Sequence, residues 1–190
     1  MRNKLLWLVP LLAAVAALQG CFPVVATGVG TGVLMAEDRR TSGTFIEDQE
    51  IELKAGSRIG DKFGDQVHIS VTSFNRNVLL TGEAPSEQLR RGVESVVRGV
   101  PNVNHITNEI AVAGPSSLAS RSNDAYLTSK VKARFIDAGK FQVNHVKVVT
   151  ENGVVYLLGL VTHKEAADSV EIARTTGGVQ KVVEVFQYID

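Results

Sequence analysis

The sequence has little of what most enzymes and nucleic-acid-binding proteins require. Among its 190 residues it carries one cysteine, so no CxxC pair exists, and it contains neither an HExxH nor a Gly-x-Ser-x-Gly motif. Its histidines are scattered, with no carboxylate at ligand spacing: His68, His105, His145 and His163. The chain therefore offers no recognisable metal site or hydrolase nucleophile, and we expect no enzyme, no bound metal and no dissociable cofactor.

The chain also lacks net charge and long apolar runs. Twenty Lys and Arg residues balance 20 Asp and Glu residues, which argues against nucleic acid as a partner. The apolar run from Leu5 to Leu18 is shorter than the roughly 20 residues that a membrane-spanning helix needs, and no later run approaches 18 apolar residues. We therefore expect no membrane-spanning helix.

The N-terminus instead has the layout of a cleaved signal. Arg2 and Lys4 precede the apolar run, and Gly20 stands directly before Cys21. This order resembles a bacterial lipoprotein signal. Gln19 is a departure, because such signals usually have Ala or Ser two places before the cysteine. The resemblance implies removal of residues 1–20 and attachment of a diacylglycerol and an N-acyl chain to Cys21. The alternative is an ordinary secretory signal followed by an incidental thiol.

Under the lipoprotein interpretation, the mature chain begins at Cys21 and is anchored by its acyl chains. Phe22 stands where the sorting rule that comes with this resemblance places an aspartate for inner-membrane retention. We therefore expect the outer membrane of a Gram-negative bacterium, with the protein facing the periplasm. Residues 21–45 show no helical or strand period, and we expect a flexible tether there.

The rest of the chain repeats itself. The segment 71–82, VTSFNRNVLLTG, matches 148–159, VVTENGVVYLLG, and a Gly-Val-x-x-Val pattern then follows in each copy, at 99–103 and at 178–182. Two matches in the same order predict a duplicated unit of some 65 to 70 residues. The second copy is longer by two residues between the two matches.

Local signals give each copy the same element order. Asn152-Gly153 lies between two β-rich runs and predicts a type I′ hairpin turn, with Asn75-Arg76 at the matching place. Thr162 and Glu165 form a capping box that starts a helix, which we expect to end at 177–178. Amphipathic segments precede each hairpin, and strands at 106–112 and 182–189 close the copies. We predict an α+β protein of two α-β-β-α-β units, each with helices on one face of a three-stranded mixed sheet.

These motifs together resemble the BON domain, and two copies behind a lipoprotein signal resemble the dual-BON outer-membrane lipoproteins. The predicted domains are 46–113 and 121–190, joined by a linker at 114–120. The resemblance implies phospholipid binding by the first helix of the second domain, maintenance of the outer membrane and recruitment to division sites. The alternative function is an adaptor that docks on envelope or division proteins, or on peptidoglycan.

The residues of that helix give the implication independent support. Leu127, Val131 and Phe135 form the predicted buried stripe, while Tyr126 and Ile136 lie on the far side. The candidate lipid-binding residues are Tyr126, Lys130, Lys132, Arg134 and Ile136. Apolar side chains beside cations are typical of a helix in a headgroup region, and an anionic phospholipid surface is the expected partner. A solvated helix face with Ile136 turned inward is the alternative.

The corresponding helix of the first copy has a different character. Its start carries Glu47, Asp48, Glu50 and Glu52, which would repel anionic lipid. Its expected apolar positions are Ile51, Leu53, Ala55 and Ile59. We expect the first domain to pack against the second and to support it.

Overall fold

The computed structural model describes residues 38–190. Cys21 and the residues before 38 lie outside the described part, so the predicted signal, the lipidation site and most of the predicted tether are not seen. Within residues 38–190, no helix is long and apolar enough to cross a membrane.

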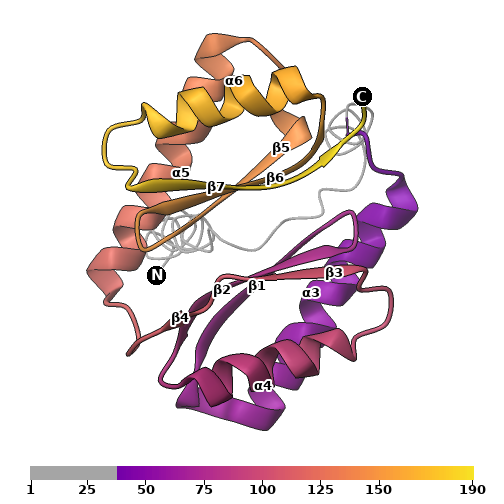
Figure 1. The fold of residues 1–190 in the computed structure, drawn as a ribbon, viewed down its shortest axis with the longest axis vertical. Helices are drawn as coiled ribbons and strands as arrows, with labels where there is room; N and C mark the ends of the chain where they lie inside the picture. The colour runs from indigo at the N-terminus through magenta and orange to yellow at the C-terminus, as the bar shows by residue number, and fades with distance from the viewer. Residues whose placement is uncertain (1–37) are drawn as a thin grey trace, which may run out of the picture. The chain divides into compact units, whose positions relative to one another are not determined.

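The first repeat has the predicted α-β-β-α-β order (Figure 1). Helix α3 (Ser42–Phe63) precedes the hairpin of β1 (His68–Phe74) and β2 (Asn77–Ala84), with the short 3₁₀ turn η1 (Gly64–Gln66) between them. Helix α4 (Glu87–Arg98) follows, and β3 (His105–Asn108) and β4 (Ala111–Val112) complete the sheet. Strand β2 pairs antiparallel with β1 and parallel with β3 and β4, so the sheet is mixed.

The second repeat has the same order. Helix α5 (Leu118–Ala138) and the 3₁₀ turn η2 (Val143–His145) precede β5 (Val146–Glu151), β6 (Val154–Val161), α6 (His163–Arg174) and β7 (Lys181–Tyr188). The central strand β6 pairs antiparallel with β5 and parallel with β7. The predicted α+β class and the two mixed sheets are confirmed.

Four predicted element bounds were wrong, and three of them have a local reason. Helix α3 begins inside the predicted tether because the Thr41 hydroxyl caps it by accepting the amide of Thr44. Helix α5 likewise begins inside the predicted linker, capped by Ser117. The predicted strand 106–112 is split at Asn108, whose side chain accepts the amide of Ile110, so the first sheet has four strands. Helix α6 ends at Arg174, three residues before the predicted glycines.

Alternation along the central strands separates two kinds of core. On one face of each sheet, residues such as Val78 and Leu80, or Val155 and Leu157, pack against the helices of the same repeat. On the other face, residues of both repeats share a single cluster: Phe74, Leu79, Tyr156 and Leu158. The sheets therefore face one another across this shared core, with the helices outside (Figure 1). The first repeat packs against the second sheet, as expected, while its supporting role stays a prediction.

The glycine at the end of each duplicated segment has a steric cause. A Cβ at Gly82 would lie 2.1 Å from the carbonyl oxygen of His68, and a Cβ at Gly159 would lie 2.4 Å from that of His145. Only a residue without a side chain lets the second strand of each hairpin approach the first so closely.

Candidate functional site

Helix α5 presents its apolar stripe inward and leaves an uncovered surface outside. Leu127, Val131 and Phe135 are buried in the core of the second repeat, as predicted. Tyr126 and Ile136 are 63% and 66% exposed, so Ile136 does not turn inward. The α5 outer surface is defined here as Tyr126, Lys130, Lys132, Ala133 and Ile136. Two large apolar side chains thus stand in solvent on one helix.

The cations near this surface have unequal freedom. The Nζ of Lys130 donates to the carbonyl oxygen of Gly177 at 2.9 Å and lies 5.9 Å from the centre of the Tyr126 ring. Lys132 is exposed and makes no hydrogen bond or ion pair with any residue in the range 38–190. Lys132 is therefore the cation best placed to meet an anion.

Arg134 makes hydrogen bonds within the second repeat. Its Nη1 donates to the carbonyl oxygen of Ile172 at 2.8 Å and to the hydroxyls of Thr175 and Thr176 at 3.2 and 2.7 Å. The guanidinium therefore satisfies the C-terminal end of α6 and holds α5 against it. Arg134 therefore positions α5, and its lipid-binding role stays a prediction.

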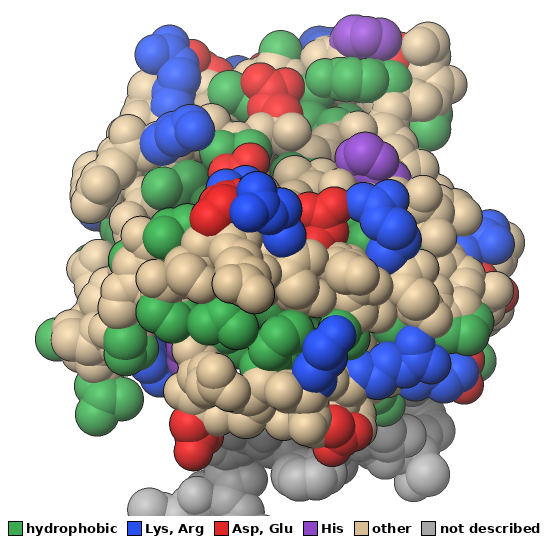
Figure 2. All heavy atoms as spheres, turned by 60° about the horizontal axis from the view of Figure 1, so that its bottom comes forward, with side chains coloured by type: hydrophobic (Ala, Val, Ile, Leu, Met, Phe, Trp, Pro, Cys, Tyr) green, Lys and Arg blue, Asp and Glu red, His purple; other side chains and the backbone are tan. Residues whose placement is uncertain are grey.

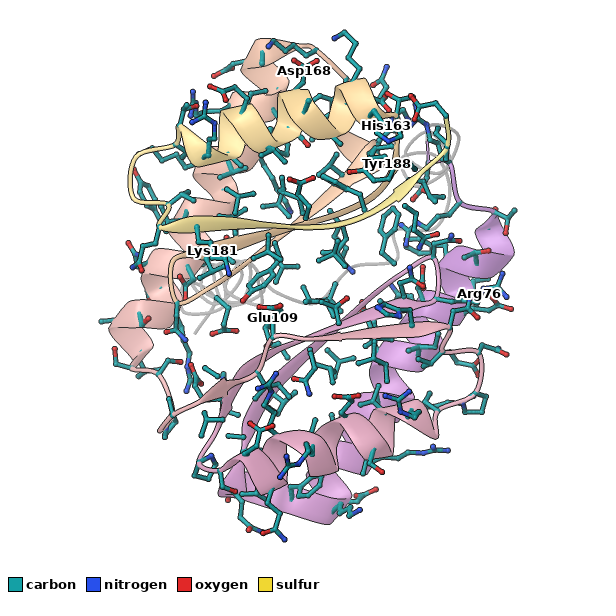
Figure 3. All side chains as sticks on the ribbon, in the orientation of Figure 1. Arg76, Glu109, His163, Asp168, Lys181 and Tyr188 are labelled. Atoms are coloured by element: carbon teal, nitrogen blue, oxygen red, sulfur yellow. The ribbon has the colours of Figure 1, made fainter. Side chains whose placement is uncertain are left out.

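Two further cations of the basic segment are engaged elsewhere. Lys140 pairs with Asp168 on α6 at 2.9 Å, and Lys147 pairs with Glu52 of the first repeat at 2.9 Å. Hydrogen bonds from Lys164 and Lys140 lower the pKa of Asp168, which lies on α6 (Figure 3). Neighbouring acids therefore neutralise part of the positive charge that the sequence places in this segment. The cations left on the α5 outer surface are Lys130 and Lys132.

The first repeat has no comparable basic surface on its first helix. Ile46 and Leu53 of α3 are 64% and 74% exposed, and Leu53 was wrongly expected in the buried stripe. It lies two residues from the buried Ile51, and therefore on the opposite side of the helix. On the face where the first repeat comes forward, acidic and basic side chains are interspersed (Figure 2).

Sequence reasoning missed one device that both repeats share. Asp48 on α3 accepts the backbone amides of Asn75 and Arg76, and Asp124 on α5 accepts those of Asn152 and Gly153, at 2.7 to 2.8 Å. Each aspartate is buried and holds the tight turn of its own hairpin. An aspartate three residues before the first buried apolar residue of each helix, Ile51 in α3 and Leu127 in α5, was the available signal.

The turn residues also join the repeats. The side-chain amide of Asn75 donates to Gln187 of β7, and that of Asn152 donates to Glu83 of β2, both at 2.7 Å. Beside them, Arg39 binds Glu165 with two hydrogen bonds of 2.7 and 2.9 Å. These contacts fix the sheet of the second repeat, and with it α5, on the first.

The histidines of the second repeat are not brought together. His145 contacts Glu165 at 3.2 Å, whereas His163 contacts Asp190 at 2.7 Å and stacks on Tyr188 (Figure 3). Within residues 38–190, no group of three or more His, Cys, Asp or Glu side chains could hold a metal ion.

Comparison with known proteins agrees with the duplication. The BON domain matches residues 47–114 and 123–190. The outer membrane lipoprotein DolP of Haemophilus influenzae is 36% identical over 182 residues, which cover 95% of this chain and 94% of that protein. The 21 kDa hemolysin of Actinobacillus pleuropneumoniae is 29% identical over 80% of this chain and 79% of its own length. The osmotically-inducible protein Y of Escherichia coli is 30% identical, covering 74% and 72% respectively.

Proposed function

This chain belongs to the dual-BON family of outer-membrane lipoproteins, and we propose that its second BON domain binds anionic phospholipid through the α5 outer surface. The protein is anchored by acyl chains on Cys21, faces the periplasm and supports outer-membrane integrity at division sites. Its role is binding, without catalysis. The observation that carries the proposal is the exposure of Tyr126 and Ile136 beside two cations.

The chemistry of that surface suits the headgroup region of a bilayer. An aromatic ring and a branched aliphatic chain gain free energy by leaving water, and each cation near an anionic surface adds on the order of 1 kcal/mol. With only two such cations, intrinsic binding is weak. Anchoring through Cys21 compensates, because it holds the domain at an effective concentration of about millimolar beside the bilayer.

Arg134 and Asp124 contribute indirectly. Arg134 ties α5 to the end of α6, and Asp124 ties α5 to the hairpin turn, so the helix is held from both sides. A rigid helix loses little conformational entropy when it meets a membrane. The α5 outer surface can therefore bind a membrane without the free-energy cost of ordering the helix first.

Vesicle co-sedimentation of residues 38–190 tests the proposal, with neutral and anionic vesicles side by side. Tyr126→Glu or Ile136→Glu should abolish sedimentation with anionic vesicles, since each removes an apolar contact and adds a repelled charge. Leu53→Glu is the matched control, because Leu53 is as exposed as these residues but lies on α3. Equal sedimentation of wild type and both α5 variants, all folded by circular dichroism, would refute the proposal.

An adaptor is the second candidate, and the exposed pair Ile46 and Leu53 on α3 favours it. These side chains lie seven residues apart, on the same side of the helix, near Glu47 and Glu50. An apolar strip edged by acids suits a protein surface better than an anionic bilayer. If Leu53→Glu abolishes the support of outer-membrane integrity in cells while vesicle binding persists, the protein acts as an adaptor and not through lipid binding.

A further inference from the structure

A small cavity lies in the first BON domain where its sheet meets the connection to the second. Its volume is about 230 Å³, and its walls include Val67, Pro85 and Pro115. His68 and Glu83 of the β1–β2 hairpin line it, and so does Arg121 from the first turn of α5. The cavity is separate from the α5 outer surface.

Glu83 is an acid in an unusual position. It is 3% exposed, and its Oε1 accepts the side-chain amide of Asn152 at 2.7 Å. Its Oε2 is buried and accepts no hydrogen bond from the residues in the range 38–190. A buried carboxylate oxygen without a donor is costly, so this atom is suited to a ligand that brings one.

His68 presents a second atom of the same kind. Its Nδ1 lies 3.2 Å from Glu83 Oε2 but is not aligned for a hydrogen bond, and within the described residues it has no other partner. A neutral imidazole protonated at Nε2 offers Nδ1 as an acceptor. Two adjacent acceptors then line one cavity, and a group with several N–H donors can satisfy both.

The charge around the cavity favours a cation at this point. Burial opposes ionisation of Glu83, but the hydrogen bond from Asn152 and the nearby amide and hydroxyl of Ser116 outweigh it and lower its pKa. The neighbouring Glu151 has its pKa raised by burial and by the charges of Glu83 and Asp124. The carboxylate of Glu83 thus carries negative charge in a place of low solvent access.

Arg121 also lines the cavity and adds a cation to its wall. Its Nε and Nη2 donate to the hydroxyl and carbonyl oxygens of Ser116, at 3.3 and 3.0 Å, which fixes the plane of the guanidinium. A guanidinium held in this way can receive an anionic oxygen with its remaining N–H groups. The cavity therefore presents acceptors for an ammonium and, separately, a donor for a phosphate.

We propose that this cavity binds a primary ammonium group carried beside a phosphate, as in phosphoethanolamine, with the ammonium on Glu83 and His68 and the phosphate toward Arg121. The group is supplied either by a phosphatidylethanolamine headgroup or by a soluble phosphoethanolamine. Such a site adds recognition of a zwitterionic headgroup to the proposed anionic contact of α5, and it does not depend on that contact.

Histidine-selective ¹⁵N NMR of the full-length protein tests the proposal, because the chain has four histidines and only His68 lines the cavity. Free phosphoethanolamine should shift the His68 signal saturably and leave the other three unchanged. Phosphocholine should not shift it, since a trimethylated nitrogen has no N–H to donate. Glu83→Gln should weaken binding about tenfold or more, because it removes the buried charge.

A second variant and a second ligand form complete the test. Ala113→Leu enlarges a side chain that lines the cavity and leaves Glu83 itself unchanged, so it should also block binding, whereas the surface control Glu87→Gln should not. Phosphatidylethanolamine vesicles compared with free phosphoethanolamine identify the source. The proposal is overturned if neither form shifts His68, if phosphocholine binds equally, or if both cavity variants bind like wild type. Neither cavity variant should change sedimentation with vesicles of phosphatidylcholine and an anionic lipid, which contain no ethanolamine. This result separates the cavity from the α5 outer surface.

Discussion

At the scale of single residues, Asp124 connects the proposed lipid helix to the hairpin behind it. Its two carboxylate oxygens accept the amides of Asn152 and Gly153, each at 2.8 Å. We predict that Asp124→Ala lowers the free energy of unfolding by about 2–4 kcal/mol, because two buried amides lose charged acceptors. Urea unfolding measures this. The control is Asp137→Ala on the exposed side of α5, and a loss of equal size there would contradict the assignment.

Glu165 predicts how stability depends on pH. Burial raises its pKa, but hydrogen bonds from Arg39, Thr162 and His145 outweigh this and bring the pKa to about 2, from 4.5. Because the folded pKa is lowered, the stabilisation is present above pH 4.5 and is lost as the pH falls toward 2. The loss is at most about 3 kcal/mol.

Glu165→Gln should flatten that part of the pH profile, as measured by urea unfolding at a series of pH values. Glu109→Gln is the matched control, because Glu109 (Figure 3) also carries a carboxylate. Within the described residues, the side chain of Glu109 makes no hydrogen bond or ion pair. A Glu165→Gln profile as steep as that of wild type would show that another acid is responsible.

At the scale of elements, the close approach of β5 and β6 depends on Gly159. A Cβ there would meet the His145 carbonyl oxygen at 2.4 Å, so Gly159→Ala must displace the backbone. We predict a loss of more than about 2 kcal/mol in unfolding free energy. Gly60→Ala in α3 is the control, since nothing lies within 4 Å of its Cβ and alanine favours a helix. Equal effects of the two variants would contradict the steric account.

Elements specified by local chemistry could be predicted from the sequence. The Asn152-Gly153 turn and the capping box of Thr162 and Glu165 are both present, because each depends on residues adjacent in the chain. The buried stripe of α5 followed from its period. The contacts of Arg134 could not be predicted, since its partners lie some 40 residues away, at the end of α6 and just after it, and are reached only in the folded domain.

The first helix shows the same limit at its start. Ser42 begins α3 within a Gly- and Thr-rich stretch that carries no helical period. Arg40 stabilises this start through Asp48 and lies over the ring of Phe74, at 2.9 Å and 4.0 Å respectively. Arg40 meets both partners only once the domain has folded, so composition alone could not reveal where α3 begins.

At the scale of the whole molecule, the two BON domains share one apolar cluster between their sheets. We propose that the predicted signal, which lies outside the described residues, directs the protein to the outer membrane. We predict that Cys21→Ser leaves the precursor unacylated and largely uncleaved, so that it no longer reaches the outer membrane. Membrane fractionation with labelled palmitate checks this. A serine variant that still fractionates as a mature outer-membrane protein would contradict the lipoprotein assignment.

The central claim is that one side of α5, and not of α3, enters the headgroup region. The chain has a single tryptophan, Trp7, inside the predicted signal, so residues 38–190 have none and a new one reports on its site alone. Tyr126→Trp and Leu53→Trp should be compared on anionic vesicles containing brominated lipid. The account predicts a blue shift and quenching of the fluorescence at position 126 and neither at position 53. Quenching at position 53 alone, or at neither position, would contradict it.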